Sequence, residues 1–309
     1  MPAEHVAAKK QVNREIFRIV LPLVTENLLQ MSAGLVTTAM IGRLLANDIS
    51  AQGISMRVFN TFWALFKGIG MGATVIIAMR LGQRLFEKCR RSAEQTYLTL
   101  IPISLLAALV VMLFPAPILG FFSNDEALIN TAVGYIRVVI LALPFSALMI
   151  VNTASYNGHG NTKTPMLIAV MLNIINIGLG YIMIYGIGSW NGFGLMGAAV
   201  TTVVAQASGA LIGLFMLYRR GGYLSEEPKP ARFWQLDMPC IREIYRTGIP
   251  AAFENAFWQL AAIVVSKVIL LYGSQYFAAY QMGLQAEMMC DVPGMGFVTA
   301  ANTLAARSI

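Results

Sequence analysis

Residues 164–218 read TPMLIAVMLNIINIGLGYIMIYGIGSWNGFGLMGAAVTTVVAQASGALIGLFMLY, which is 55 consecutive residues without an Asp, Glu, Lys or Arg. A helix of about 20 apolar residues crosses the hydrocarbon core of a bilayer, so this stretch is long enough for two crossings and a turn. Its runs are long and lack the alternation that marks barrel strands. We therefore expect helices, which satisfy their backbone polar groups within the segment.

The composition of the whole chain agrees with a membrane protein. Hydrophobic residues make up 57% of the 309 residues and charged residues 12%, with a mean hydropathy of +0.64. A soluble domain carries about 25% charged residues. The fold class we expect is an all-α polytopic membrane protein, with eight spans at about 17–41, 51–79, 97–119, 131–156, 165–186, 197–218, 247–272 and 277–306.

The basic residues between the apolar runs orient the chain. Seventeen of the 22 Lys and Arg lie in the N-terminal segment and in loops on one side, whereas the loops of the other side hold only Arg43. Cytoplasmic loops are enriched in Lys and Arg, so we expect a cytoplasmic N-terminus and a multi-pass protein of the inner (plasma) membrane. Because these charges separate apolar runs and form no single patch, the net charge of +7 does not indicate nucleic-acid binding.

Histidine and cysteine are too few and too dispersed for a metal site. The three cysteines, Cys89, Cys240 and Cys290, are far apart in the sequence, and the two histidines are His5 and His159. Neither the paired spacing of a zinc site nor a set of nucleophile and base is visible. We expect no metal, no organic cofactor and no enzymatic activity.

A repeat defines the domain organisation. Residues 14–27 read REIFRIVLPLVTEN and residues 242–255 read REIYRTGIPAAFEN, so Pro22 and Glu26 recur as Pro250 and Glu254 at an offset of 228. Six predicted spans, an even number, separate the two copies, so both copies enter the membrane from the same side. Such parallel repeats about an axis along the membrane normal occur in transporters.

The repeat divides the chain into three parts. We expect a six-helix N-terminal lobe in residues 1–218, a cytoplasmic linker in 219–246, and the first two helices of an incomplete C-terminal lobe in 247–309. A second lobe of equal length would extend to about position 456, twice the offset of 228. We therefore read the chain as a fragment of a longer protein.

Short motifs along nearly the whole chain, in this order and at these spacings, resemble the bacterial branch of the MATE (multidrug and toxic compound extrusion) family. These motifs are GLVTTAMIGR at 34–43, GIGMGA at 68–73, ALPF at 142–145, NGHGNTKTPM at 157–166, LNIINIGLGY at 172–181, IYG at 184–186, GLMGAA at 194–199, PGMG at 293–296 and AANTL at 300–304.

The resemblance implies a twelve-helix fold of two six-helix lobes. It also implies a monomeric antiporter that exports amphipathic, often cationic small molecules and drugs from the bilayer against an inward flow of protons or sodium ions. This function is our leading interpretation. Its alternatives are a lipid-linked sugar flippase of the same two-lobe architecture, which would need a basic cavity, and an inactive fragment of a transporter.

Two positions of the first lobe bear on ion coupling through the resemblance. The family usually has an Asp where this chain has Thr37, and the Thr hydroxyl cannot take up a proton at any useful pH, which calls coupling through this lobe into question. The resemblance also implies a role for Asn176 in the lobe cavity. Apart from the resemblance, the usual role of a buried amide is a hydrogen bond between helices.

Four acidic residues fall within or beside predicted spans, where each charge costs about 2.5–3.5 kcal/mol. Glu287 and Asp291 are four residues apart and share a helix face, and Asp291 lies within roughly 10 Å of Glu254 in depth. We expect these three acids to meet in one cavity that holds a proton, a sodium ion or a cationic substrate in mutual exclusion. The fourth acid, Glu26, either joins the cation site or pairs with Lys67, which lies mid-span and needs an acidic partner.

Overall fold

The computed structural model describes residues 21–26, 28–29, 32, 34, 36–43, 46–188, 190–219, 222–224, 235–284, 286–287, 294 and 298. Its helices are α2 (Ala46–Gly82), α3 (Phe86–Leu113), α4 (Pro115–Gly120), α5 (Glu126–Val139), α6 (Ala142–Gly158), α7 (Lys163–Tyr185), α8 (Leu195–Tyr218) and α10 (Met238–Leu270). A two-stranded antiparallel hairpin, β1 (Gly186–Ile187) and β2 (Trp190–Asn191), connects α7 to α8. Residues 21–26, 36–41 and 274–284 are also helical.

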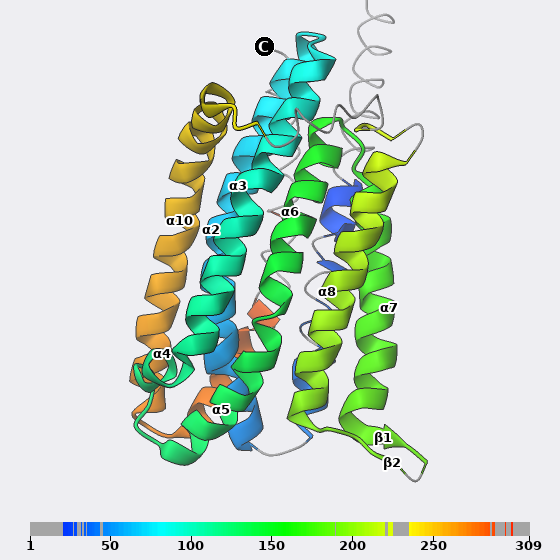
Figure 1. Ribbon diagram of the computed structural model, residues 1–309. Helices are drawn as coiled ribbons and strands as arrows, with labels where there is room; N and C mark the ends of the chain where they lie inside the picture. Colours follow the sequence, from blue (N-terminus) through cyan, green and yellow to red (C-terminus); the bar gives the residue numbers. More distant parts are fainter. Residues whose placement is uncertain are drawn as a thin grey trace, which may run out of the picture.

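The helices form one elongated bundle (Figure 1). The central helix is α2, which packs against α10, α6, α3 and α5, while α7 and α8 pack against each other. Five of these helices are long and apolar enough to cross a membrane, and the bent pair of α5 and α6 makes a sixth. The expected all-α polytopic fold is therefore confirmed. We call the end of the bundle where α2, α6 and α8 finish, and where α3, α7 and α10 begin, the basic end.

One predicted span is bent. The segment expected as a single helix at 131–156 is divided into α5 and α6, which meet at an angle of 46°. Pro144 lies in the first turn of α6. Proline has no backbone N–H to donate, and its ring collides with the carbonyl of the residue four positions earlier in a helix. The chain adapts with a tighter turn, in which the Leu143 N–H donates to the Ile140 carbonyl at 2.9 Å. The sequence contains this proline, but the hydropathy that predicted a single span carries no information about a bend within it.

The predicted limits of two helices at the basic end were wrong. Helix α3 begins at Phe86, eleven residues before position 97, and α10 begins at Met238, nine residues inside the expected linker 219–246. The start of α10 is fixed by Asp237, whose carboxylate accepts from the Cys240 N–H at 3.2 Å and caps the helix. Both extensions carry several charged residues, so a search for apolar spans leaves them out.

The backbones of α2 and α10 approach each other closely along a line of small residues. A Cβ atom added to Gly68 would lie 2.3 Å from the Cα of Ala252, and one added to Gly72 would lie 2.6 Å from the N of Gly248. No side chain can occupy those positions without separating the helices. Small residues permit such close helix contacts in membranes, where packing replaces the hydrophobic effect as the driving force for helix association.

Substitution of one glycine tests this contact. We expect Gly68→Ala to lower the free energy of unfolding by about 1–3 kcal/mol, the usual effect of overpacking, because its methyl group meets backbone. Gly178→Ala is the matched control, since Gly178 is also helical and an added Cβ there meets nothing within 4 Å. Thermal unfolding of the purified protein in detergent measures both variants. Equal melting temperatures for the two variants would contradict the contact.

Candidate functional site

The two acids related by the repeat occupy different environments. The first, Glu26, is buried with 4% of its surface exposed. It lies close enough to Lys67 of α2 for their charges to interact, and the Lys67 ammonium also lies 4.8 Å from the centre of the Trp63 ring. Lys67 therefore lies within range of an acidic charge, and its direct pairing with Glu26 stays a prediction. A cation entering this site would compete with a positive charge that is already present, which favours a structural role for Glu26.

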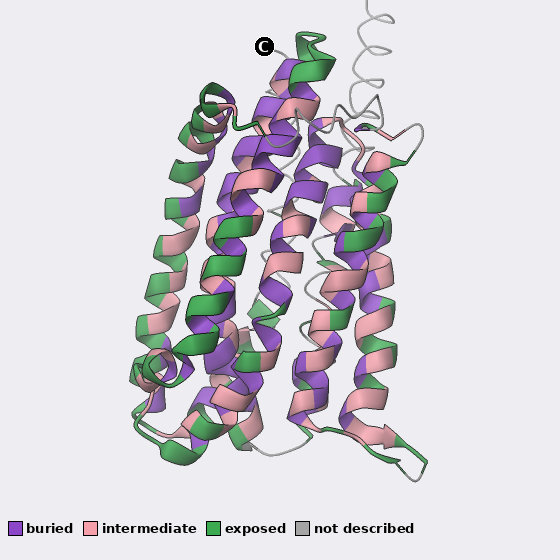
Figure 2. Cartoon of the chain, in the orientation of Figure 1, coloured by how far each residue is buried: buried purple, intermediate pink, exposed green. Residues whose placement is uncertain are grey.

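The second acid, Glu254, lies on α10 and is exposed in the described structure. Two residues earlier, Ala252 contacts Gly68 of α2. Since two helical residues turn the chain by about 200°, Glu254 lies on the side of α10 that faces away from α2. Its neighbours Phe257 and Trp258 are 69% and 77% exposed, so the carboxylate lies beside exposed apolar side chains. Figure 2 shows that exposed residues occur along the length of α10.

The predicted convergence of three acids is not settled by the described residues. Glu287 is helical, and its side chain is exposed. Asp291 lies outside the described residues. A shared cavity for Glu254, Glu287 and Asp291 therefore stays a prediction.

The polar residues of the first lobe differ in how they are held. Thr37 is half-buried, and the Asn176 amide is also half-buried and donates to the Leu172 carbonyl of its own helix at 3.0 Å. The neighbouring Asn173 instead connects two helices. Its amide donates to the Leu29 carbonyl at 2.6 Å and accepts from the Ser32 hydroxyl at 2.9 Å. The bridge between helices is thus made by Asn173, one turn from the residue that the family pattern selects.

Two further polar contacts were missed by the sequence reasoning. Asn152 of α6 accepts a hydrogen bond from the Tyr97 hydroxyl at 2.6 Å and donates to the Ala210 carbonyl at 2.8 Å, which joins α3, α6 and α8. Arg80 is buried at the basic end and contacts both α3 and α10. The sequence could have indicated Asn152, because an amide within an apolar span is unusual. It could not have indicated Arg80, because a basic residue at the end of a span is common.

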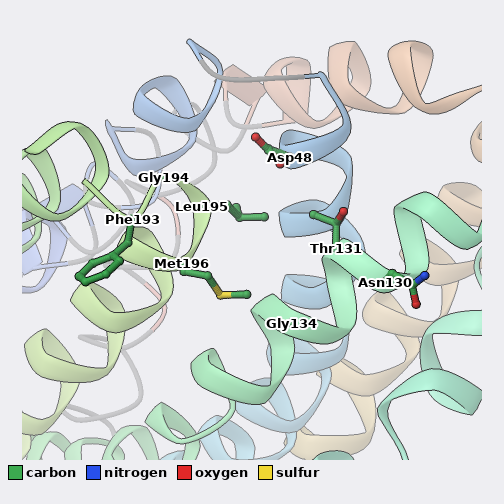
Figure 3. A pocket seen from close by; sticks show the side chains of 8 residues that line it. All are labelled: Asp48, Asn130, Thr131, Gly134, Phe193, Gly194, Leu195 and Met196. Atoms are coloured by element: carbon green, nitrogen blue, oxygen red, sulfur yellow. The ribbon is translucent and has the colours of Figure 1, made fainter. Parts of the chain in front are cut away.

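A cavity of about 540 Å³ opens at the end of the bundle opposite the basic end. Figure 3 shows side chains from α2, α5 and the start of α8 around it, with Asp48 as its one carboxylate and Phe193 turned away. None of the predicted site residues that the structure describes lines this cavity. Among the residues that the structure describes, no group of three or more His, Cys, Asp or Glu is placed to hold a metal ion.

Comparison with known proteins identifies the family. The MatE family model matches residues 22–182, which is more than half of the chain. The chain belongs to the MatE family. The probable multidrug resistance protein NorM of Thermotoga maritima is 28% identical over 309 residues, which cover 99% of this chain and 65% of that protein. The probable multidrug resistance protein YoeA of Bacillus subtilis is 27% identical, with coverage of 98% and 65%.

Solved structures show the same fold. A crystal structure of MATE in complex with MaD5 superposes with a TM-score of 0.82 at 21% identity, covering 95% of this chain and 66% of that one. An outward-facing conformation of a multidrug resistance MATE family transporter gives a TM-score of 0.77 at 22% identity, with coverage of 94% and 64%. The fold is that of a MATE transporter, and the chain spans about 65% of the length of the curated relatives described above.

The pairing of Glu26 with Lys67 is testable with a double-mutant cycle. We expect Glu26→Gln or Lys67→Met alone to lower the free energy of unfolding by up to about 3–5 kcal/mol, because each leaves an uncompensated buried charge. The double variant should be less destabilised than the sum of the single variants. Denaturant titration in mixed micelles measures all three, with Arg137→Gln on an exposed face of α5 as the control for loss of a basic charge. Strictly additive effects would contradict the pairing.

Proposed function

We propose that the whole protein is a cation-coupled antiporter that exports amphipathic or cationic small molecules by alternating access. It works as a monomer in the plasma membrane with its N-terminus in the cytoplasm, and its coupling ion is a proton or a sodium ion. Family membership supports the transporter class, and the relatives NorM and YoeA carry the name of multidrug resistance proteins. The basic end would face the cytoplasm, in accord with the positive-inside rule.

The observation that carries the proposal is the different surroundings of the two repeated acids. Glu26 interacts with Lys67, whereas Glu254 stands exposed on an apolar face of α10. The predicted span at 277–306, which corresponds to α2 in the repeat, contains no Lys or Arg and instead carries Glu287 and Asp291. The first copy of the repeat therefore combines an acid, Glu26, with a base in its next span, Lys67, whereas the corresponding span of the second copy carries acids only. Within the part of the chain that the structure describes, Glu254 forms no ion pair with a base, and a carboxylate in such surroundings can accept an exchangeable cation.

The proposed exchange follows from the energetics of charge in a membrane. A carboxylate at this depth is stabilised when a cation or a proton neutralises it. Binding of a proton or sodium ion at Glu254 would therefore displace a cationic substrate, and the reverse exchange would occur on the other side of the membrane. Thr37 offers no titratable group, so this exchange is assigned to the second lobe.

Efflux by single variants of the full-length protein tests this assignment. We expect Glu254→Gln to reduce ion-driven efflux to background, because the amide keeps the size of the side chain and loses its charge. Thr37→Ala should retain efflux within about twofold, since few surface or half-buried polar substitutions act strongly away from a site. Glu126→Gln, in the exposed first turn of α5, is the control for an acid-to-amide change. Fluorescent cation efflux from energised cells, normalised to membrane expression, is the measurement.

The opposite pattern would return the ion site to the first lobe. That pattern is wild-type efflux by Glu254→Gln together with loss of efflux in Thr37→Ala. Loss in Glu126→Gln as well would mean that removal of any acid on the chain disables the protein, and would leave Glu254 without a special role.

A further inference from the structure

The buried guanidinium of Arg80 joins the first lobe to the start of α10. One nitrogen, Nη1, donates to the Lys88 carbonyl at 3.1 Å and to the Ser92 hydroxyl, both on α3. The same nitrogen lies 3.2 Å from the Cys240 thiol, and Nη2 forms an ion pair with Glu243 at 2.5 Å. Two of these partners therefore belong to the same lobe as Arg80 and two belong to α10.

A second group of contacts holds the residues just before α10. The Gln95 amide of α3 donates to the Gln235 carbonyl at 2.9 Å and accepts from the Asp237 N–H at 2.9 Å. Arg91, also on α3, lies 3.9 Å from the Asp237 carboxylate and donates to the Gln235 carbonyl. We call the two groups together the latch, which consists of Arg80, Arg91 and Gln95 on the first lobe and Gln235, Asp237, Cys240 and Glu243 at the start of α10.

The chemistry of the latch suits a contact that opens and closes. The Glu243 side chain is 41% exposed, so water can take the place of Arg80 when the two separate. The Arg80 side chain is 10% exposed, yet it would keep the Ser92 hydroxyl and the Lys88 carbonyl after losing Glu243. The Glu243 carboxylate becomes hydrated and the Arg80 guanidinium keeps two neutral acceptors, and both effects lower the free-energy cost of separating the ion pair.

The contact nearer the middle of the membrane is different in kind. There α2 and α10 touch through Gly68, Gly72, Gly248 and Ala252, without a polar side chain among these four. Packing of this sort has no directional bonds to break when one helix tilts on the other. Among the described residues, the directional bonds between α2 and α10 in this half of the bundle are those of Arg80 with Cys240 and Glu243.

From this arrangement we infer that Arg80 and Glu243 hold the basic end of the protein closed in one state of the transport cycle and separate in the other. Arg80 is thus a positioning residue for transport. The inference rests on the alternating access of the proposed function, and it adds the contact that distinguishes the two states at the basic end.

Cys240 provides a native reporter of the latch. Its thiol is 4% exposed beneath Arg80 when the latch is closed, and separation of α10 from Arg80 would uncover it. Among residues 1–309 there are three cysteines, so Cys89→Ser with Cys290→Ser leaves Cys240 as the single thiol of this part, and any cysteine elsewhere in the full-length protein is replaced by serine as well. N-ethylmaleimide crosses membranes and labels an uncovered thiol from either side.

The experiment measures the rate of N-ethylmaleimide labelling of Cys240 in membranes that contain the full-length protein. Adding Glu243→Gln should raise this rate roughly tenfold, because a charge-assisted hydrogen bond is lost from the closed state alone. Arg242→Gln, at the adjacent exposed position of α10, should leave the rate unchanged. In the parent protein, the rate should also change when a proton or sodium gradient is imposed.

A second reporter separates opening of the latch from unfolding. Cys89 is 1% exposed, and its thiol faces the Ile77 carbonyl within the contact of α3 with α2. With Cys240→Ser and Cys290→Ser, labelling of Cys89 should stay slow in Glu243→Gln. Equal uncovering of Cys89 and Cys240 would overturn the proposal, and so would unchanged labelling of Cys240 in Glu243→Gln or under every gradient. Labelling needs no substrate, so it can be interpreted even if the Glu254 experiment shows no efflux.

Discussion

The close approach of α2 and α10 is the constraint on which the other features depend. Because Gly68 and Gly72 meet the backbone of α10 at Ala252 and Gly248, both the height and the rotation of α10 are fixed against the first lobe. That rotation places Glu254 on the side away from α2. It also brings Glu243, a little more than one turn before Gly248, to the guanidinium of Arg80.

The sequence repeat does not extend to the surroundings of its two acids. The repeat gives Glu26 and Glu254 equivalent positions in sequence, yet Glu26 interacts with a lysine and Glu254 is exposed. The two acids therefore differ in the charges around them, although the repeat places them at equivalent positions. Under the proposed function, the first lobe needs no titratable group at Thr37, because the cation would bind in the second lobe.

Much of this arrangement could be predicted from the sequence, because hydropathy and the repeat are properties of neighbouring or equally spaced residues. The all-α membrane fold followed from hydropathy, whereas the expectation of an acid near Lys67 came from the cost of a charge inside the membrane. The start of α10 at Met238 did not, since polar helical turns outside the bilayer resemble a linker. The partners of Arg80 could not be predicted either. Glu243 is 163 residues away, and a buried arginine cannot be distinguished in sequence from one that only marks topology.

Because α2 is long, a small tilt of this helix moves its end at Arg80 by a large distance. Its 37 residues extend about 55 Å, well beyond the hydrocarbon core of about 30 Å. Arg80 lies twelve residues from Gly68, which is about 18 Å along the helix axis. If α2 tilts by about 5° about its contact with α10 at Gly68, the guanidinium of Arg80 moves by about 1.6 Å, which is enough to break a hydrogen bond. A tilt of α2 on α10 that is too small to disturb the core would then be enough to separate Arg80 from Glu243 at the basic end.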